Sequence, residues 1–295
     1  MKKAACLFVL SIVLAFLEAC SVIDPPISIP SYIHIDSIHV TDTYTTQGTA
    51  SSKISDAWVY VNNQYIGAFP LPATIPVLSQ GSDTVSIDAG IEISGISANR
   101  GQYPFYGQFK QKAILTQGQK ISIRPTVTYL PKTVFVWKED FEQSSTTFQP
   151  GQNGKSPVPL QKLNHSPLVF QGNASGMAIM DSINKGQNFF EQWSSNAFVL
   201  PSDGSPVYVE LNYLCNNSFT VGMYTSADTT APIPVINMNP CPQLTRSNWK
   251  KIYINLTPAL QQFPAASYYI YFYMDQDPGV AAPTLYIDNV KLLIF

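Results

Sequence analysis

Short runs of alternating apolar and polar residues, separated by turn signals, make up most of the chain after residue 31. Successive side chains of a strand point to opposite faces of its sheet, so this alternation predicts half-buried strands. Ala57–Val61 and Lys120–Ile123 follow the pattern, and no window of residues 32–131 shows an apolar stripe of helical period. The sequence therefore predicts an all-β protein built from β-sandwich-type domains.

Two series of predicted strands meet near Pro131, and 295 residues are enough for two ordinary β domains. We predict a small N-terminal β-sandwich module over residues 32–131 and a second β domain over residues 132–295. In the first, Asn62-Asn63 between two β-rich runs predicts a hairpin. The aromatic loop Arg100–Gly107 is expected either to pack on the second domain or to contact a partner.

The first twenty residues have the pattern of a secretory signal: a basic start, an apolar run and a small residue before Cys20. The apolar run Ala4–Leu17 is shorter than the roughly 20 residues that a permanent membrane helix needs. Leu17-Glu18-Ala19-Cys20 resembles a bacterial lipobox, which implies removal of residues 1–19 and a membrane anchor on lipidated Cys20. Residues 20–31 would then form a proline-rich tether. The alternative is an ordinary signal that is cut elsewhere.

The composition limits both partners and cysteine chemistry. A net charge of −2 gives no basic surface for nucleic acid. Of the four cysteines, Cys6 would leave with the signal and Cys20 would carry lipid. The remaining pair, Cys215 and Cys241, predicts a disulfide in an oxidising compartment. Two buried free thiols and a metal-binding pair are the alternatives.

Three groups of residues carry a family resemblance. Ser55–Gly67, followed by Pro70–Ala73, resembles small PEGA-like surface β modules. Glu139–Glu142 and Tyr286–Lys291, at the two ends of the second half, resemble the β-jelly-roll modules of carbohydrate-binding and adhesive proteins. The whole arrangement is similar to uncharacterised surface lipoproteins of Bacteroidetes-type envelopes. This resemblance implies an outer-membrane lipoprotein, in the periplasmic or the surface-exposed leaflet, and it implies no activity.

The jelly-roll resemblance also implies that the first and last strands lie close together, where acidic groups often hold a structural Ca²⁺. Carboxylate oxygens are the ligands that Ca²⁺ prefers. The candidate metal ligands are Glu139, Asp140, Glu142 and Asp288. The alternative is that these residues are solvated edge charges and a turn cap, and no other cofactor is expected.

Aromatic residues gather in two segments of the second half, and sugars stack their C–H groups on exposed aromatic rings. We expect Phe189–Trp193 to form a short helix or an aromatic loop. Alternation places Tyr269, Tyr271 and Tyr273 on one face of the other predicted strand, either packed or as an exposed platform. The candidate ligand-binding residues are Phe189, Phe190, Trp193, Tyr269, Tyr271 and Tyr273.

Motifs for catalysis are missing from the sequence, which has three histidines and neither a Gly-x-Ser-x-Gly nor a His-Glu-x-x-His pattern. We therefore expect no enzyme. The sequence favours a non-catalytic envelope lipoprotein that recognises glycans through its C-terminal jelly roll. The alternative is a structural or adhesive envelope protein that binds other proteins.

Overall fold

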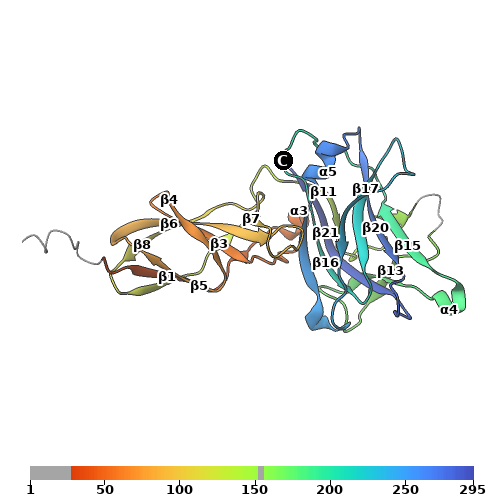
Figure 1. The fold of residues 1–295 in the computed structure, drawn as a ribbon, viewed down its shortest axis with the longest axis horizontal. Coiled ribbons are helices and arrows are strands. Elements are labelled where there is room, and N and C mark those ends of the chain that lie inside the picture. The colour runs from red at the N-terminus through yellow and green to blue at the C-terminus, as the bar shows by residue number, and fades with distance from the viewer. Residues whose placement is uncertain (1–27, 152–155) are drawn as a thin grey trace, which may run out of the picture.

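The computed structural model describes residues 28–151 and 156–295, so the predicted signal segment and Cys20 lie outside the described residues. The described chain is almost entirely β structure, which confirms the predicted fold class. Figure 1 shows two groups of strands arranged end to end along the long axis of the molecule. Every strand ladder pairs strands on the same side of residue 131. Within the described residues, no helix is both long and apolar enough to cross a membrane.

The N-terminal group contains three sheets around one apolar core. In these three sheets the strands have the orders β5-β1-β9, β10-β2 and β4-β3-β6. Both β7 and β8 also pair with β6. The core is filled by alternate residues of these strands, such as Ile33, Val59 and Ile87. The elements are β1 (Ser31–Ile35), β2 (His39–Val40), α3 (Tyr44–Gln47), β3 (Asp56–Val61), β4 (Gln64–Pro70), β5 (Ala73–Val77), β6 (Gly81–Glu92), β7 (Arg100–Gln102), β8 (Phe109–Leu115), β9 (Lys120–Ile123) and β10 (Thr126–Val127).

The predicted hairpin is present: β3 and β4 pair in antiparallel fashion around Asn62 and Asn63. Both turn residues have positive φ, 50° and 66°, as the two-residue hairpin turns that match strand twist require. Asparagine tolerates this conformation better than most residues. The Asn62 side chain donates to Asp83 Oδ1 at 2.6 Å and accepts from the Thr84 N–H at 2.9 Å, which ties the turn to β6.

The C-terminal group is a sandwich of two sheets. One has the order β13-β14-β21-β16-β19, with β11 also on β21, and the other has the order β12-β15-β20-β17-β18. The elements are β11 (Val134–Glu139), β12 (Phe148–Pro150), β13 (Gln161–Asn164), β14 (Ala174–Ile179), α4 (Ser182–Lys185), β15 (Phe189–Ser194), β16 (Tyr208–Cys215), β17 (Phe219–Thr225), β18 (Ile233–Met238), the 3₁₀ turn η2 (Arg246–Asn248), β19 (Lys250–Asn255), α5 (Thr257–Gln262), β20 (Tyr268–Asp275) and β21 (Thr284–Ile294). The first and last strands are neighbours, as the jelly-roll resemblance implies, because β11 pairs with β21 from Val134 to Glu139.

Two expectations about the second half differ from the structure. Phe189–Ser194 is strand β15, not a helix or loop, because it pairs with β20 on one side and β12 on the other. Cys215 and Cys241 are free thiols, not a disulfide. They are nevertheless neighbours, since the Cys241 N–H donates to the Cys215 carbonyl at 2.7 Å. The hydrogen bond between the two thiols, followed by burial, raises the pKa of the Cys215 thiol.

The aromatic loop of the first half packs on the second, which confirms the first of its two alternatives. Tyr103, Phe105 and Tyr106 are buried. The Tyr103 ring lies 5.5 Å from the Tyr208 ring of β16 and 4.7 Å from the Tyr253 ring of β19, measured between centroids. Aromatic contacts therefore join the two groups of sheets.

Candidate functional site

The predicted ligand-binding residues lie on β15 and β20, and five of the six share the outer face of their sheet. Trp193 and Tyr271 are cross-strand partners, and the adjacent strand β17 adds Tyr224 beside Tyr269. Phe190 is the exception: it is fully buried in the sandwich core and is unavailable to a ligand. The reason is alternation within β15, which turns Phe190 inward and its neighbours Phe189 and Glu191 outward.

The outward residues form a continuous cluster that we call the aromatic face. Its members are Phe189, Glu191, Trp193, Tyr224, Tyr269, Tyr271 and Tyr273. The Trp193 ring lies 4.5 Å from the Tyr224 ring and 5.5 Å from the Tyr269 ring, and Tyr224 lies 4.9 Å from Tyr271. Tyr224 was missed by the sequence analysis, although alternation along Phe219–Tyr224 places it opposite the buried Val221 and Met223.

The aromatic face has a packed centre and an accessible rim. Trp193 is 5% exposed and Tyr271 is 4% exposed, because their rings cover one another and Tyr224. Phe189, Tyr269 and Tyr273 keep part of their surface in solvent. The Tyr271 ring lies across Gly222, where a Cβ atom would stand 2.6 Å from the ring. Glycine is therefore required at position 222 for the tyrosine to lie flat on the sheet.

Glu191 gives the aromatic face a hydrogen-bond acceptor and a negative charge. Its Oε1 accepts a hydrogen bond from Trp193 Nε1. Burial, with the Glu191 charge, raises the pKa of Tyr271 to about 12 and also raises the pKa of Tyr224. The tyrosine hydroxyls therefore stay protonated near neutral pH. The face combines apolar rings, hydroxyl groups and one carboxylate, the mixture that suits a polyhydroxylated apolar-faced ligand.

The predicted metal ligands lie near one another in the fold, yet each carboxylate has its own set of donors. Glu139 is 4% exposed, and it accepts from the Phe141 N–H at 2.7 Å and from Thr147 Oγ1 at 2.7 Å. Glu142 Oε1 accepts from the N–H groups of Asn173 and Ala174 at 2.8 and 3.1 Å. These two carboxylates close the loops that follow β11 and precede β14.

Asp140 and Asp288 are engaged in the same way. Asp140 Oδ2 accepts from the Tyr44 hydroxyl at 2.5 Å, and this hydrogen bond is the main cause that raises the pKa of Tyr44 to about 12. Asp288 accepts from Ser175 Oγ and from the Asn289 N–H, each at 2.7 Å, and burial raises its pKa to about 7. Within the described residues, no three His, Cys, Asp or Glu side chains converge as a metal site. The calcium site stays a prediction.

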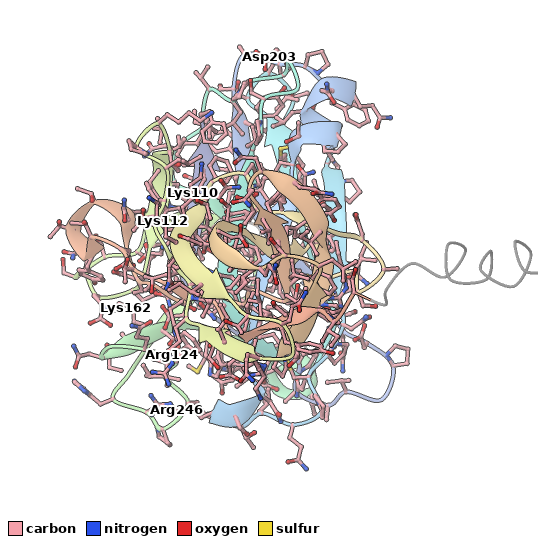
Figure 2. All side chains as sticks on the ribbon, turned by 90° about the vertical axis from the view of Figure 1, so that its left-hand side faces the viewer. Lys110, Lys112, Arg124, Lys162, Asp203 and Arg246 are labelled. Atoms are coloured by element: carbon pink, nitrogen blue, oxygen red, sulfur yellow. The ribbon has the colours of Figure 1, made fainter. Side chains whose placement is uncertain are left out.

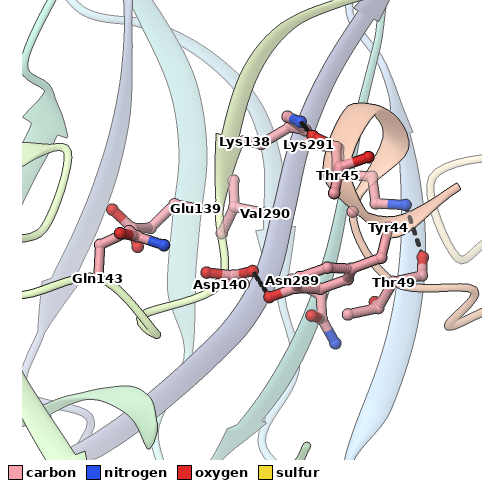
Figure 3. A pocket seen from close by; sticks show the side chains of 11 residues that line it. Tyr44, Thr45, Thr49, Lys138, Glu139, Asp140, Gln143, Asn289, Val290 and Lys291 are labelled. Carbon is pink, nitrogen blue, oxygen red and sulfur yellow. Dashed lines mark hydrogen bonds between the residues drawn. The ribbon is translucent and has the colours of Figure 1, made fainter. Parts of the chain in front are cut away.

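Tyr44 and Asp140 line a pocket of about 340 Å³ where α3 meets the edge of the sandwich. Figure 3 shows the Tyr44 ring crossing the pocket to reach Asp140, with Asn289 beside it. Lys138 donates to the carbonyls of Thr45 and Thr46 at 3.0 and 2.9 Å and holds α3 in place. The pocket is small, and its charged groups already take part in hydrogen bonds, so the aromatic face is the better candidate site.

Comparisons with known proteins do not assign the chain to a family. No family profile matches the chain, and no curated protein matches it. Similar solved structures include carbohydrate-binding modules. The module TmCBM61 in complex with beta-1,4-galactotriose is 16% identical, with 50% of this chain and 88% of that chain covered and a TM-score of 0.34. The CBM22-1-CBM22-2 tandem domain of Paenibacillus barcinonensis Xyn10C is 13% identical, with 84% of this chain and 75% of that chain covered and a TM-score of 0.37.

An adhesin domain is also among the similar structures. The cleaved adhesin domain of Lys-gingipain from Porphyromonas gingivalis is 12% identical, with 55% of this chain and 97% of that chain covered and a TM-score of 0.39. All three TM-scores lie below 0.5, so these likenesses carry no argument about this chain's ligand. The functional proposal rests on the geometry of the aromatic face.

Proposed function

We propose that this protein is a non-catalytic glycan-binding lipoprotein of the cell envelope, and that its jelly roll contacts the glycan through the aromatic face. Six aromatic rings and one carboxylate on the outer side of β15, β20 and β17 are the observation that carries the proposal. The sugar's C–H groups would stack on the exposed parts of Phe189, Tyr269 and Tyr273. Its hydroxyl groups would exchange hydrogen bonds with Glu191 and the tyrosine hydroxyls.

The anchor and the calcium ion belong to the same proposal. Lipidated Cys20 would hold the chain on the outer membrane, in the periplasmic or surface-exposed leaflet. Labelling of cells with a palmitate analogue checks this anchor, because a Cys20→Ser chain that still takes up label would contradict it. A structural Ca²⁺ near Glu139, Asp140, Glu142 and Asp288 is an optional part, and glycan binding through the aromatic face does not require it.

The test of glycan binding is an array screen of the chain from Ser21 onward, with and without Ca²⁺. We expect saturable binding that weakens by up to about tenfold in Tyr269→Ala or Tyr273→Ala, since each change removes a stacking ring that contributes roughly 0.5–1.5 kcal/mol. Both residues are partly exposed, so their truncation should leave the sandwich core intact.

Phe263→Ala is the matched control, because Phe263 is an aromatic residue of the same domain that is 43% exposed and lies outside the aromatic face. Its binding should equal that of the unchanged chain. A blank result on a broad array would contradict the glycan proposal and favour the alternative of an envelope protein that binds other proteins. Equal losses in the control and the tyrosine variants would also exclude the aromatic face as the site.

A further inference from the structure

A second aromatic surface lies on the N-terminal group of sheets, on the outer side of β4, β3, β6 and β8. Ala57, Val59 and Val61 of β3 point into the core, so Trp58 and Tyr60 point outward. Tyr65 of β4 joins them: its ring lies 5.8 Å from the Trp58 ring and 5.2 Å from the Tyr60 ring. Tyr65 is 49% exposed. The three rings form a platform that is independent of the jelly roll.

Strand register continues this platform toward two lysines. Tyr65 pairs with Tyr60, Tyr60 with Ser86, and Ser86 with Lys110. Lys112 follows two residues later on β8 and faces the same way. Neighbouring strands lie about 4.8 Å apart, so the row crosses four strands in about 15 Å. Figure 2, which looks onto this end of the molecule, shows Lys110 and Lys112 beside each other.

Two polar atoms on this surface have no partner within the described residues. Ser86 is 1% exposed, and its hydroxyl oxygen makes no hydrogen bond. The indole Nε1 of Trp58 is also buried without an acceptor. This indole lies over Gly90, where a Cβ atom would stand 2.9 Å from its ring. Leaving a buried polar group unsatisfied is costly in free energy, and an ordered water is a sufficient partner for such a group.

The charge of the surface favours an anion. Asp88 lies beside Trp58, but its carboxylate accepts hydrogen bonds from Gln108 and Gln102 at 3.0 and 3.3 Å. Lys110 and Lys112 are exposed, and neither takes part in an ion pair in the part of the chain that the structure describes. An acidic ligand would therefore meet two lysines and one carboxylate, Asp88, which lies within electrostatic reach of Lys110.

We propose that this surface, the N-terminal face (Trp58, Tyr60, Tyr65, Ser86, Lys110 and Lys112), binds an acidic polysaccharide. Its sugar rings stack on Tyr65 and Trp58, and its carboxylates pair with the two lysines. A uronic-acid chain fits because it presents apolar ring faces and negative charge along one extended polymer. The site is separate from the aromatic face and does not depend on glycan binding there.

The test measures binding of the full chain to polygalacturonate and to the same polymer with its carboxylates methyl-esterified. We expect polygalacturonate to bind and the esterified polymer to bind about tenfold more weakly, because esterification removes the charges that pair with the two lysines. Tyr65→Ala and the double variant Lys110→Ala/Lys112→Ala should each weaken binding to polygalacturonate by about tenfold or more. Added salt should weaken binding of the unchanged chain.

Lys120→Ala/Arg124→Ala is the matched control, because it removes the same charge from exposed positions at β9, in a different sheet. Its binding should match that of the unchanged chain, and thermal unfolding confirms that every variant is folded. Absence of binding, equal binding of the two polymers, or equal losses in both double variants would overturn the proposal. Loss in Tyr269→Ala with no change in Tyr65→Ala would also overturn it, since the polymer would then lie on the aromatic face.

Discussion

Asp288 is a buried carboxyl group, and its burial disfavours the ionised form. It is 1% exposed, and its donors are the Ser175 hydroxyl and the Asn289 N–H. Burial raises its pKa from 3.8 to about 7. Between these pH values the folded chain holds a proton that the unfolded chain has released, so this group stabilises the fold below about pH 4 and its contribution is lost as the pH rises through 7.

Asp288→Asn should remove that dependence, because the amide is neutral at every pH. Between pH 5 and pH 8, we expect the unfolding free energy of the unchanged chain, measured by urea denaturation, to fall relative to that of the variant by on the order of 2 kcal/mol. If the unfolding free energies of the two chains change with pH in the same way, the pKa of Asp288 is not raised in the folded protein. Ca²⁺ added at pH 8 gives a second reading: stabilisation of the unchanged chain alone would place a bound cation on Asp288.

The β3–β4 hairpin shows how much an element depends on two turn residues. Asn62→Ala would lose the hydrogen bonds to Asp83 and from Thr84 and would put alanine at a φ of 50°, which asparagine tolerates better. We expect a loss of about 2 kcal/mol in unfolding free energy, measured by urea denaturation. Asn63→Gly is the matched variant, because glycine accepts the φ of 66° without strain, and it should change stability by less than about 1 kcal/mol. Equal losses in both variants would show that the side-chain hydrogen bonds of Asn62 contribute nothing.

The elements also show what sequence could predict. The hairpin and the alternation of Tyr268–Tyr273 follow from local chemistry, and the structure confirms both. Phe189–Ser194 was mispredicted because a mixed run of aromatic and polar residues has no distinct period, and its pairing with β12 and β20 decides its conformation. The partners of Glu139 and Glu142 include backbone N–H groups, in loops whose closure no local pattern reveals.

At the scale of the whole molecule, a buried ionic cluster fixes the two groups of sheets to each other. Glu210 of β16 is fully buried, and its Oε2 lies 2.8 Å from Lys251 Nζ of β19. Its Oε1 accepts from the hydroxyls of Tyr103 and Tyr129, at 2.6 and 2.9 Å, and both tyrosines belong to the N-terminal group. Lys291 of β21 donates to the Thr49 carbonyl at 2.6 Å across the same junction.

Glu210→Gln should therefore disturb both stability and shape. It leaves Lys251 buried without its countercharge, for which we expect a loss of about 3–5 kcal/mol in unfolding free energy. Lys53→Ala is the control: it breaks the Lys53–Glu92 pair, whose lysine side chain is 55% exposed, and should cost less than about 1 kcal/mol. The double variant Glu210→Gln/Lys251→Met should recover part of the loss, because it removes the unpaired charge as well.

Small-angle scattering tests whether this cluster holds the two proposed binding surfaces in a fixed relative position. If the cluster fixes the junction, the N-terminal face and the aromatic face keep a fixed relative position. We expect Glu210→Gln/Lys251→Met to broaden the distance distribution, while the affinity of each face for its own short oligosaccharide stays unchanged. An unaltered scattering profile would show that the aromatic contacts of Tyr103, Phe105 and Tyr208 fix the junction without the ion pair.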